Sequence, residues 1–318
     1  MSALPEGQHV LVIGSAGIDV KARPAEKLAP GSAVPGLIRD SVGGVARNIA
    51  ENLARLEVPT VLLTAVGGDA PGARVLDRCR DAGVNVSRAL VIPEARTGHY
   101  VALLSAEGRL DVAISDYEIT RQLDSKYLIK NREYFARAAL IVIDASLQDT
   151  ALKTLFRLAG KYHRRVCADP TSPVLAGRLA PYLDRIEMIT PNLVEAIALC
   201  GDPCLETVPV QDRDTALASA QRLLERGVHV AAVTIGVNGV VYASGTDRGH
   251  IPAIRTEIVD ATGAGDAFTS AAIFGMLNDF PLDEALRLGV SAASLTLHSS
   301  ETVLPNLSLE LLYDQLVI

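Results

Sequence analysis

Residues 260–266 read Asp-Ala-Thr-Gly-Ala-Gly-Asp, and this stretch decides how the rest of the chain is interpreted. It runs into the segment 264–277, whose small and apolar residues are typical of a buried helix. Glycine and alanine at such a junction let backbone N–H groups turn toward one point, where the helix N-terminus adds positive potential. The stretch therefore predicts an anion-binding hole at the beginning of a helix.

The last residue of this stretch, Asp266, has two interpretations. It can accept a proton from a hydroxyl that lies in line with a bound phosphate, as the general base of a phosphoryl transfer. It can equally be an ordinary N-terminal cap of a helix that follows a glycine turn. Taken alone, the stretch favours the two interpretations about evenly.

Around this stretch, aliphatic runs of strand length alternate with segments of helical periodicity. Such an order predicts an α/β fold with right-handed crossovers and a largely parallel sheet. Aromatic residues make up only 4% of the chain and Trp is absent, which also favours aliphatic helices packed on a sheet. We expect strands at 9–14, 60–66, 140–143, 165–168, 186–189 and 229–235, a hairpin at 240–243 and 250–254, and helices at 43–56, 69–82, 150–159, 193–199, 215–226, 264–277, 281–297 and 307–316.

Two segments interrupt the alternation. The first is rich in Pro, Gly and charged residues, and the second contains two β-like runs joined by a turn-like Ser-Ala-Glu-Gly. We expect residues 20–40 and 96–116 to form a small β lid, and residues 1–19, 41–95 and 117–318 to form the α/β core. Because a small sheet has exposed edges, we also expect two lids to pair in a homodimer.

The overall charge and composition exclude some classes of protein. The formal net charge is −7 and no cluster of Lys and Arg is visible, which argues against binding to a nucleic-acid polymer. No run of eighteen apolar residues occurs and no apolar run precedes the first strand, so we expect no membrane partner and a cytoplasmic location. The four cysteines lack a zinc-site spacing and are expected to be reduced, with Cys200 and Cys204 in a loop.

The complete run 260–266 resembles the second signature of the ribokinase-like (phosphofructokinase B type) family of carbohydrate and nucleoside kinases. The resemblance implies a three-layer α/β/α sandwich with a mostly parallel central sheet and a small β-sheet lid. It implies that Asp266 is the catalytic base and that the backbone of Gly263, Ala264 and Gly265 forms the anion hole. ATP, as phosphate donor, and Mg²⁺ are the implied cofactors.

Residues near the first strand are similar to the substrate-binding part of the family. Gly43 and Gly44, followed by Asn48, resemble its first signature, in which the glycines let the sugar approach and the Asn binds a sugar hydroxyl. Asp19 resembles the aspartate that binds two substrate hydroxyls. From the residues alone, a glycine pair that opens a helix and a solvated loop carboxylate are the favoured readings.

Further positions resemble the part of the family that binds the nucleotide and cations. The resemblance implies that Asn192 and Glu195 organise Mg²⁺ and its waters, although Pro191 and Asn192 also suit a helix start and cap. The strand-end loop with Thr234, Gly236 and Gly239 resembles the one that lies along the nucleotide, and its alternative is a plain hairpin turn. Asp260 and Thr262 match positions that line a monovalent-cation site in several relatives, so a potassium requirement is considered.

Within the family, three features resemble the members that act on pseudouridine: the run 43–56, the strand ending Val-Ala-Ile-Ser-Asp at 112–116, and the Asp-Pro pair at 169–170. The implied reaction is phosphorylation of the 5′-hydroxyl of pseudouridine. Thr97, Ser115 and Asp116 are the residues expected to meet the edge of uracil, although Asp116 can also be a turn residue. Gly17 departs from the pattern, because pseudouridine-associated relatives often carry Asn there.

Other functions stay open as alternatives. A kinase for another nucleoside or for a free sugar such as ribose fits the same signatures. A sugar or nucleoside sensor without catalysis on the same fold is the alternative from another class. A dinucleotide-binding oxidoreductase and a Walker-type NTPase are disfavoured, because the chain has no G-x-G-x-x-G after a strand and no G-x-x-x-x-G-K-[ST].

Overall fold

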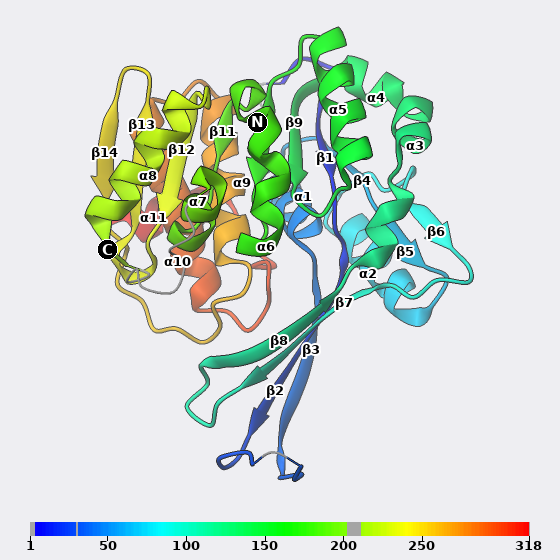
Figure 1. The fold of residues 1–318 in the computed structure, drawn as a ribbon, viewed down its shortest axis with the longest axis vertical. Helices are drawn as coiled ribbons and strands as arrows, with labels where there is room; N and C mark the ends of the chain where they lie inside the picture. The colour runs from blue at the N-terminus through cyan, green and yellow to red at the C-terminus, as the bar shows by residue number, and fades with distance from the viewer. Residues whose placement is uncertain (1–3, 30, 202–210, 318) are drawn as a thin grey trace.

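The computed structural model describes residues 4–29, 31–201 and 211–317, and these form three layers with a smaller sheet projecting from them (Figure 1). The middle layer is an eight-stranded sheet in the order β14-β13-β12-β11-β10-β9-β1-β4, parallel except where β13 runs against its two neighbours. This confirms the three-layer sandwich with a mostly parallel sheet. Its strands are β1 (His9–Ile13), β4 (Thr60–Leu63), β9 (Ala138–Asp144), β10 (Val166–Asp169), β11 (Met188–Ile189), β12 (Val230–Thr234), β13 (Val240–Ser244) and β14 (Arg248–Ile251).

Helices cover both faces of the large sheet. Because successive side chains of a strand point to opposite faces, Val10 and Val12 of β1 join one apolar core while Leu11 and Ile13 join the other. The first core contains side chains from α1 (Val45–Arg55), α2 (Ala70–Asp81), α9 (Ala264–Leu277), α10 (Leu282–Leu297) and α11 (Leu309–Val317). The second contains side chains from α3 (Ser125–Lys130), α4 (Arg132–Arg137), α5 (Asp149–Lys161), α6 (Pro173–Ala176), α7 (Leu193–Cys200) and α8 (Arg213–Glu225).

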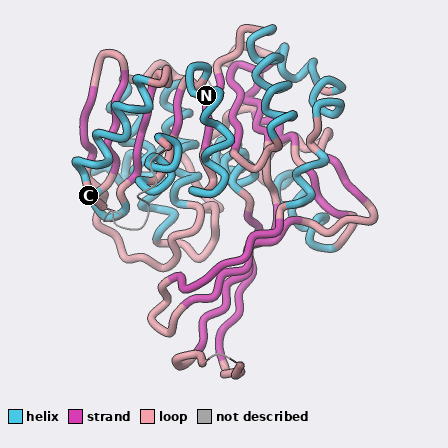
Figure 2. Tube along the Cα trace, viewed as in Figure 1, coloured by secondary structure: helices cyan, strands magenta, loops and turns pink. Residues whose placement is uncertain are grey.

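The small sheet extends below the body as four long strands in the order β3-β2-β7-β8 (Figure 2). They are β2 (Gly17–Pro24), β3 (Gly36–Gly43), β7 (Gly98–Leu104) and β8 (Leu110–Asp116). The turn between β7 and β8 is closed by a hydrogen bond from the Gly108 N–H to the Ser105 carbonyl, as the sequence predicts. The separate sheet is therefore confirmed, and β2 and β3 continue into the body at Gly17 and Gly43.

The register of the small sheet gives it two different faces. Asp19, Tyr100 and Ser115 pair across β2, β7 and β8, so their side chains lie in one row on one face. The next row, one residue along each strand, points the other way and contains Val101 and Ile114. One face therefore carries polar groups toward the body, and the other exposes apolar side chains.

Some expected elements differ from the structure. The expected strand 60–66 is two strands, because β5 (Ala65–Gly67) leaves the large sheet and pairs with β6 (Leu90–Ile92). Short helical segments also occur that periodicity did not predict. They are α3, α4 and α6 with the 3₁₀ helices η1 (Glu118–Gln122), η2 (Gly177–Arg185) and η3 (Gly236–Asn238). Most are too short to show a helical period, and the nine-residue η2 is a 3₁₀ helix with Pro181 inside it.

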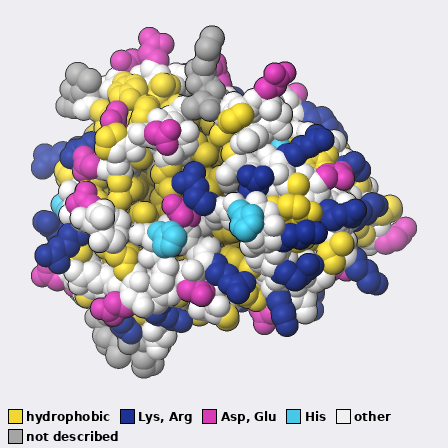
Figure 3. Space-filling model, turned by 90° about the horizontal axis from the view of Figure 1, so that it is seen from above, with side chains coloured by type: hydrophobic (Ala, Val, Ile, Leu, Met, Phe, Trp, Pro, Cys, Tyr) yellow, Lys and Arg dark blue, Asp and Glu magenta, His cyan; other side chains and the backbone are white. Residues whose placement is uncertain are grey.

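The surface and the cysteines add three observations. On the face remote from the small sheet, Lys and Arg side chains are interspersed with Asp, Glu and apolar side chains (Figure 3). Across the described ranges, no helix is both long and apolar enough to traverse a bilayer. Cys79 and Cys167 are buried thiols, and burial raises the pKa of each to about 12, whereas Cys204 lies outside the described residues.

Candidate active site

A cavity of about 730 Å³ lies between the polar face of the small sheet and the carboxyl ends of the large sheet's strands. The small sheet contributes the row formed by Asp19, Tyr100 and Ser115. The body contributes Asn48 from the first turn of α1 and Asp266 from the first turn of α9. Open α/β sheets hold their ligands at this edge, so the cavity has the expected position of a substrate site.

A second cavity, of about 480 Å³, lies on the other side of residues 260–266. Ala261, Ala264 and Gly265 line this cavity, whereas Thr262, Gly263 and Asp266 line the first one. The glycine-rich stretch therefore forms the wall between two cavities. Thr234, Gly236 and Gly239, three predicted nucleotide-binding residues, line the second cavity.

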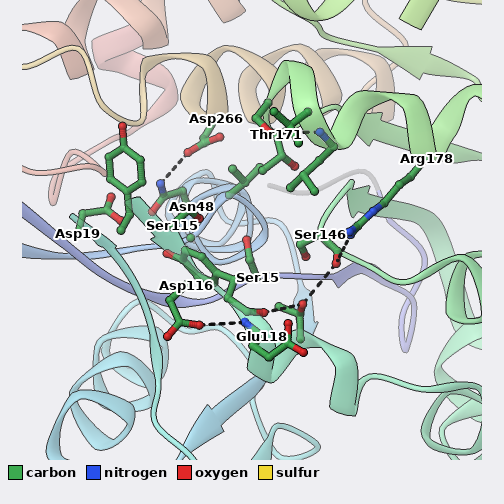
Figure 4. Close-up of a pocket in the computed structure, with 18 of the residues that line it drawn as sticks. Ser15, Asp19, Asn48, Ser115, Asp116, Glu118, Ser146, Thr171, Arg178 and Asp266 are labelled. Carbon is green, nitrogen blue, oxygen red and sulfur yellow. Dashed lines mark hydrogen bonds between the residues drawn. The ribbon is translucent and has the colours of Figure 1, made fainter. Parts of the chain in front are cut away.

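Asp266 is buried at this wall, with 8% of its surface exposed. Its Oδ2 accepts a hydrogen bond of 2.6 Å from the Asn48 amide nitrogen (Figure 4). Burial raises the pKa of Asp266 to about 7, while the Asn48 hydrogen bond and the Arg47 charge lower it and the nearby carboxylates of Asp19 and Asp144 raise it. A carboxyl group with a pKa near neutrality is suited to take a proton from a hydroxyl.

Asp19 is also a buried carboxyl group, and burial raises its pKa to about 6. Gly43 does not line the cavity but packs against Asp19, since a Cβ at Gly43 would lie 2.2 Å from the Asp19 carboxylate. Gly44 lines the first cavity and is the residue before α1. The glycine pair therefore places Asp19 and opens the start of the helix.

Gly263 adopts a backbone conformation that only glycine takes easily. Its φ is +86°, and a Cβ there would lie 2.0 Å from the Thr302 carbonyl oxygen. The chain can therefore turn sharply at Gly263 and begin α9 at Ala264. This turn directs the backbone of the first turn of α9 toward the wall between the cavities.

Asn192 and Glu195 form a reciprocal capping box at the start of α7. The Asn192 N–H donates to Glu195 Oε2, and the Glu195 N–H donates to Asn192 Oδ1, both at 2.9 Å. Asn192 therefore caps this helix, which is the alternative role that the sequence also allowed. Burial raises the pKa of Glu195, and the box leaves its Oε1 for a further partner.

Asp260 does not present a vacant pair of oxygens for a cation. Its Oδ2 is paired with Lys21 of the small sheet, and its Oδ1 accepts the Thr262 N–H at 2.9 Å. Thr262 itself lines the first cavity. The arrangement does not fit a monovalent ion at the Asp260 carboxylate, because the Lys21 ammonium already supplies the positive charge there.

The three residues expected to read a base are separated in the structure. Ser115 and Asp116 line the first cavity from β8. Thr97 is buried and does not line it; its hydroxyl bonds to Asp69 Oδ1 at 2.5 Å and accepts the Gly67 N–H at 3.0 Å. The expectation for Thr97 is corrected, since this hydroxyl connects β5 to the cap of α2.

The departure at Gly17 has a structural reason. A Cβ at Gly17 would lie 2.3 Å from the Gly98 carbonyl oxygen and 2.9 Å from the Tyr117 ring, so no side chain fits there. A Cβ at Gly98, its partner on β7, would lie 2.5 Å from the same ring. Tyr117 lines the first cavity and was missed by the sequence analysis. Its signal was the pair of glycines in neighbouring strands, which becomes visible only once the register is known.

Two other side chains, one that lines the cavity and one buried behind it, had no role in the sequence analysis. Arg178 lines it from η2 and donates to the Ser146 carbonyl at 3.1 Å (Figure 4). Asp169 is a buried carboxyl group, and burial raises its pKa well above the ordinary range. The negative charges of Asp266 and Glu195 raise this pKa further. The Asp-Pro pair at 169–170 marked a resemblance but gave Asp169 no place at the site, and Arg178 lies in no recognisable local motif, so only the meeting of distant segments shows their positions.

A model described as pfkB family carbohydrate kinase matches residues 8–308. The chain belongs to this family. It is 32% identical to a pseudouridine kinase from Escherichia coli (strain K12), covering 96% of this chain and 95% of that one. It is 28% identical to a guanosine-inosine kinase from Exiguobacterium acetylicum, covering 92% and 95%.

Solved structures show the same fold. A ribokinase from Arabidopsis thaliana complexed with ribose and ATP superposes with a TM-score of 0.83 at 22% identity, covering 98% of this chain and 99% of that one. PfkB family kinases are ATP-dependent phosphotransferases that act on hydroxyls of sugars or nucleosides. The chain is accordingly a sugar or nucleoside kinase of the PfkB family.

Proposed function

We propose that this kinase transfers the γ-phosphate of ATP to the 5′-hydroxyl of a ribonucleoside, and that the nucleoside is pseudouridine. The observation that carries the proposal is the position of residues 260–266 between the two cavities, with Asp266 on one side and Gly265 on the other. A hydroxyl beside Asp266 and a phosphate at the N-terminus of α9 would then meet at this wall.

The first cavity suits a nucleoside better than a free pentose. Asp19 and Asn48 lie at its inner end, where they would hold the ribose diol while O5′ faces Asp266. Its volume of about 730 Å³ lies well within the range of roughly 300–1,000 Å³ that is usual for ligand pockets. This volume leaves room beyond the ribose for a base, beside Ser115 and Asp116 on the small sheet.

Asp116 supports pseudouridine within the nucleosides. A carboxylate accepts hydrogen bonds and cannot donate them, and pseudouridine offers one more ring N–H than uridine. In the structure one oxygen of Asp116 accepts the Glu118 N–H at 3.3 Å, which leaves the other for a ligand. Asp116 is exposed in the structure. Once a bound base covers it, an acceptor that uridine leaves unpaired would favour pseudouridine by about 1–3 kcal/mol.

In the proposed reaction, Asp266 accepts the proton of O5′ as that oxygen forms its bond to the γ-phosphorus, and the bond from the γ-phosphorus to the ADP oxygen breaks. The backbone of Gly263, Ala264 and Gly265 stabilises negative charge at the start of α9. ATP would lie along Thr234, Gly236 and Gly239 in the second cavity. We also propose that the reaction takes place in the cytoplasm.

Mg²⁺ would be held by this chain through its bound water molecules. The capping box uses Oε2 of Glu195 and leaves Oε1, and magnesium in phosphate sites usually keeps several waters. Glu195 would hold such a water, with Asn192 fixing its position. The charge of the ion at the phosphates would stabilise the transferred group. Potassium does not enter the proposal, because Lys21 is paired with Asp260.

The proposed homodimer would form through the outer face of the small sheet. Ile38, Val112 and Ile114 are exposed there by 71%, 54% and 71%. A face with this much exposed apolar surface is typical of an interaction site, and packing against the same face of a second copy would cover it.

The test of the proposed function is identification of the product. The protein is incubated with ATP, Mg²⁺ and pseudouridine, and the product is examined by phosphorus NMR. We expect ADP and one new phosphate monoester whose phosphorus couples to the two 5′ protons. Coupling to a 2′ or 3′ proton would contradict the proposed position. No consumption of ATP with any nucleoside or sugar would favour the sensor.

A further inference from the structure

Arg47 is the largest side chain buried almost completely in the described structure, with 1% exposed. Its guanidinium is paired with Glu51 one helical turn away. Nη2 donates to the Val42 carbonyl at 2.5 Å, to Thr302 Oγ1 at 2.8 Å and to Asn48 Oδ1. One group therefore connects the end of β3, the segment before α11 and the residue that contacts Asp266.

The contact with Asn48 determines how its amide is turned. A guanidinium only donates hydrogen bonds, so the amide atom that faces Arg47 must be the oxygen. The amide nitrogen then faces Oδ2 of Asp266, to which it donates at 2.6 Å. The opposite orientation would place two donors together at Arg47 and two acceptors together at Asp266, which leaves four buried polar groups badly paired.

The amide orientation matters for the carboxylate. A bond from Asn48 to Oδ2 favours the charged form of Asp266 and fixes its plane. No hydrogen bond within the described residues occupies Oδ1, which is thus left for the hydroxyl of the substrate. If the Asn48 amide could flip, Asp266 would lose both the hydrogen bond that favours its charged form and the fixed plane of its carboxylate while the amide is reversed.

Arg47 also fixes the wall that carries the anion hole. Thr302 Oγ1 accepts from Arg47 and donates to the Val42 carbonyl at 2.6 Å. The Thr302 carbonyl is the group against which Gly263 packs. The same guanidinium therefore holds the backbone behind Gly263 and the amide in front of Asp266.

We propose that Arg47 is a positioning residue for phosphoryl transfer, which acts through Asn48 by keeping the amide NH₂ toward Asp266. This inference rests on the proposed function, because it requires Asp266 to be the base. The alternative is a purely structural role in the buried cluster of Arg47, Glu51 and Arg55. The two roles differ in whether the effect of Arg47 depends on Asn48.

The test is a double-mutant cycle on steady-state kinetics with Arg47→Met, Asn48→Ala and the double variant. We expect Arg47→Met to lower kcat by roughly tenfold to a hundredfold, the scale of a misplaced contact at the reacting group. With Asn48→Ala already present, the same substitution should lower kcat several-fold less than in the parent, because only the support of the wall through Thr302 is then left to lose.

Arg55→Met is the matched control. Arg55 lies on the same helix and also pairs with Glu51, but its other hydrogen bond goes to the Pro305 carbonyl. We expect this variant to keep kcat within about twofold of the parent. The inference is overturned if Arg47→Met lowers kcat by the same factor in the parent and in Asn48→Ala. It is also overturned if Arg47→Met alone keeps kcat within about twofold of the parent.

If Arg47→Met does not fold, Arg47→Lys replaces it in the cycle. Lys keeps a positive charge toward Glu51 but cannot replace the planar fork that reaches Asn48 and Thr302 together. The dependence on Asn48 should be the same, and additive losses again overturn the inference. Asp266→Asn separates a failure of this inference from a failure of the proposed function. Full turnover in that variant refutes the proposed function, whatever the cycle shows.

Discussion

The amide nitrogen of Asn48 lies 2.6 Å from Oδ2 of Asp266, although the two residues are 218 positions apart in the chain. Each belongs to the first turn of a helix that follows a glycine, α1 after Gly44 and α9 after Gly263. The contact joins the two segments that resemble family signatures into one site. It is also the contact through which the proposed sugar-binding side chain meets the proposed base.

Asp266→Asn should lower kcat by roughly two to four orders of magnitude, which is the scale of a positioned general base. The amide has nearly the same shape as the carboxyl group but cannot accept the proton. Steady-state turnover measures the loss, and binding of ATP to the variant serves as the control. Turnover within about threefold of the parent would refute the role of Asp266.

The same variant should change stability with a defined dependence on pH. The pKa of Asp266 is raised to about 7 in the folded protein by burial, so its contribution to stability is lost as the pH rises from the unfolded value, near 4, through 7. Asp266→Asn removes this charge. The unfolding temperature of the variant should therefore exceed that of the parent by the largest amount above pH 7. The gain should disappear toward pH 4. A gain that grows as the pH falls would contradict the direction of the shift.

The acidic limb of the pH–rate profile should also reflect the buried carboxyl groups. Both Asp266 and Asp19 have pKa values raised by burial, to about 7 and about 6. If both must be charged, kcat/KM should fall about tenfold per pH unit just below pH 7 and more steeply below pH 6. Asp19→Asn should remove the steeper part. A profile that is flat down to pH 5 would count against both assignments.

The sequence predicted the large fold because its strands and helices are long enough to show their periods. Val10 to Ile13 are all apolar, as expected for a strand buried on both faces. The exceptions are short: α3 and α4 have six residues each, fewer than two helical turns, and β5 leaves the sheet because of its pairing with β6. Pairing between distant segments leaves no local pattern.

The site was predictable to the extent that it lies in local motifs. Asp266, Asn48 and Asp19 each lie within four residues of a glycine near the start of an element, and the structure brings all three to one cavity. Thr97 was placed there from its position beside a strand, but its hydroxyl is used by Asp69. Tyr117 and Arg178 reach the cavity only through the tertiary fold, so no spacing in the chain indicates them.

Two glycines of the stretch should differ in their tolerance of alanine. Gly263→Ala should lower the free energy of unfolding by roughly 1–3 kcal/mol, since its φ is +86° and the Cβ would meet the Thr302 carbonyl. At Gly265 no atom lies within 4 Å of an added Cβ, and alanine favours a helix. Gly265→Ala should therefore keep or slightly raise stability. Equal effects in denaturant titrations would show that the turn does not depend on Gly263.

The outer face of the small sheet should control the oligomeric state. Ile114→Lys places a charge on the exposed apolar face, so the proposed dimer should dissociate. Val91→Lys is the matched control, because Val91 is also exposed but lies on β6, outside the small sheet. Light scattering at micromolar concentration measures the mass of each. A monomeric parent protein under the same conditions would contradict the pairing of lids.

The most direct measurement for the central claim is kcat/KM for pseudouridine, uridine, adenosine and ribose with one preparation of the enzyme. We predict that pseudouridine is the best substrate, since Asp116 would accept the additional ring N–H while Asp19 and Asn48 would hold the ribose. Uridine should be slower by roughly tenfold or more, the effect of leaving the Asp116 acceptor unpaired once the bound base covers it. If ribose or adenosine exceeds pseudouridine by about tenfold or more, equivalent to about 1.4 kcal/mol in transition-state binding, the proposed substrate is wrong.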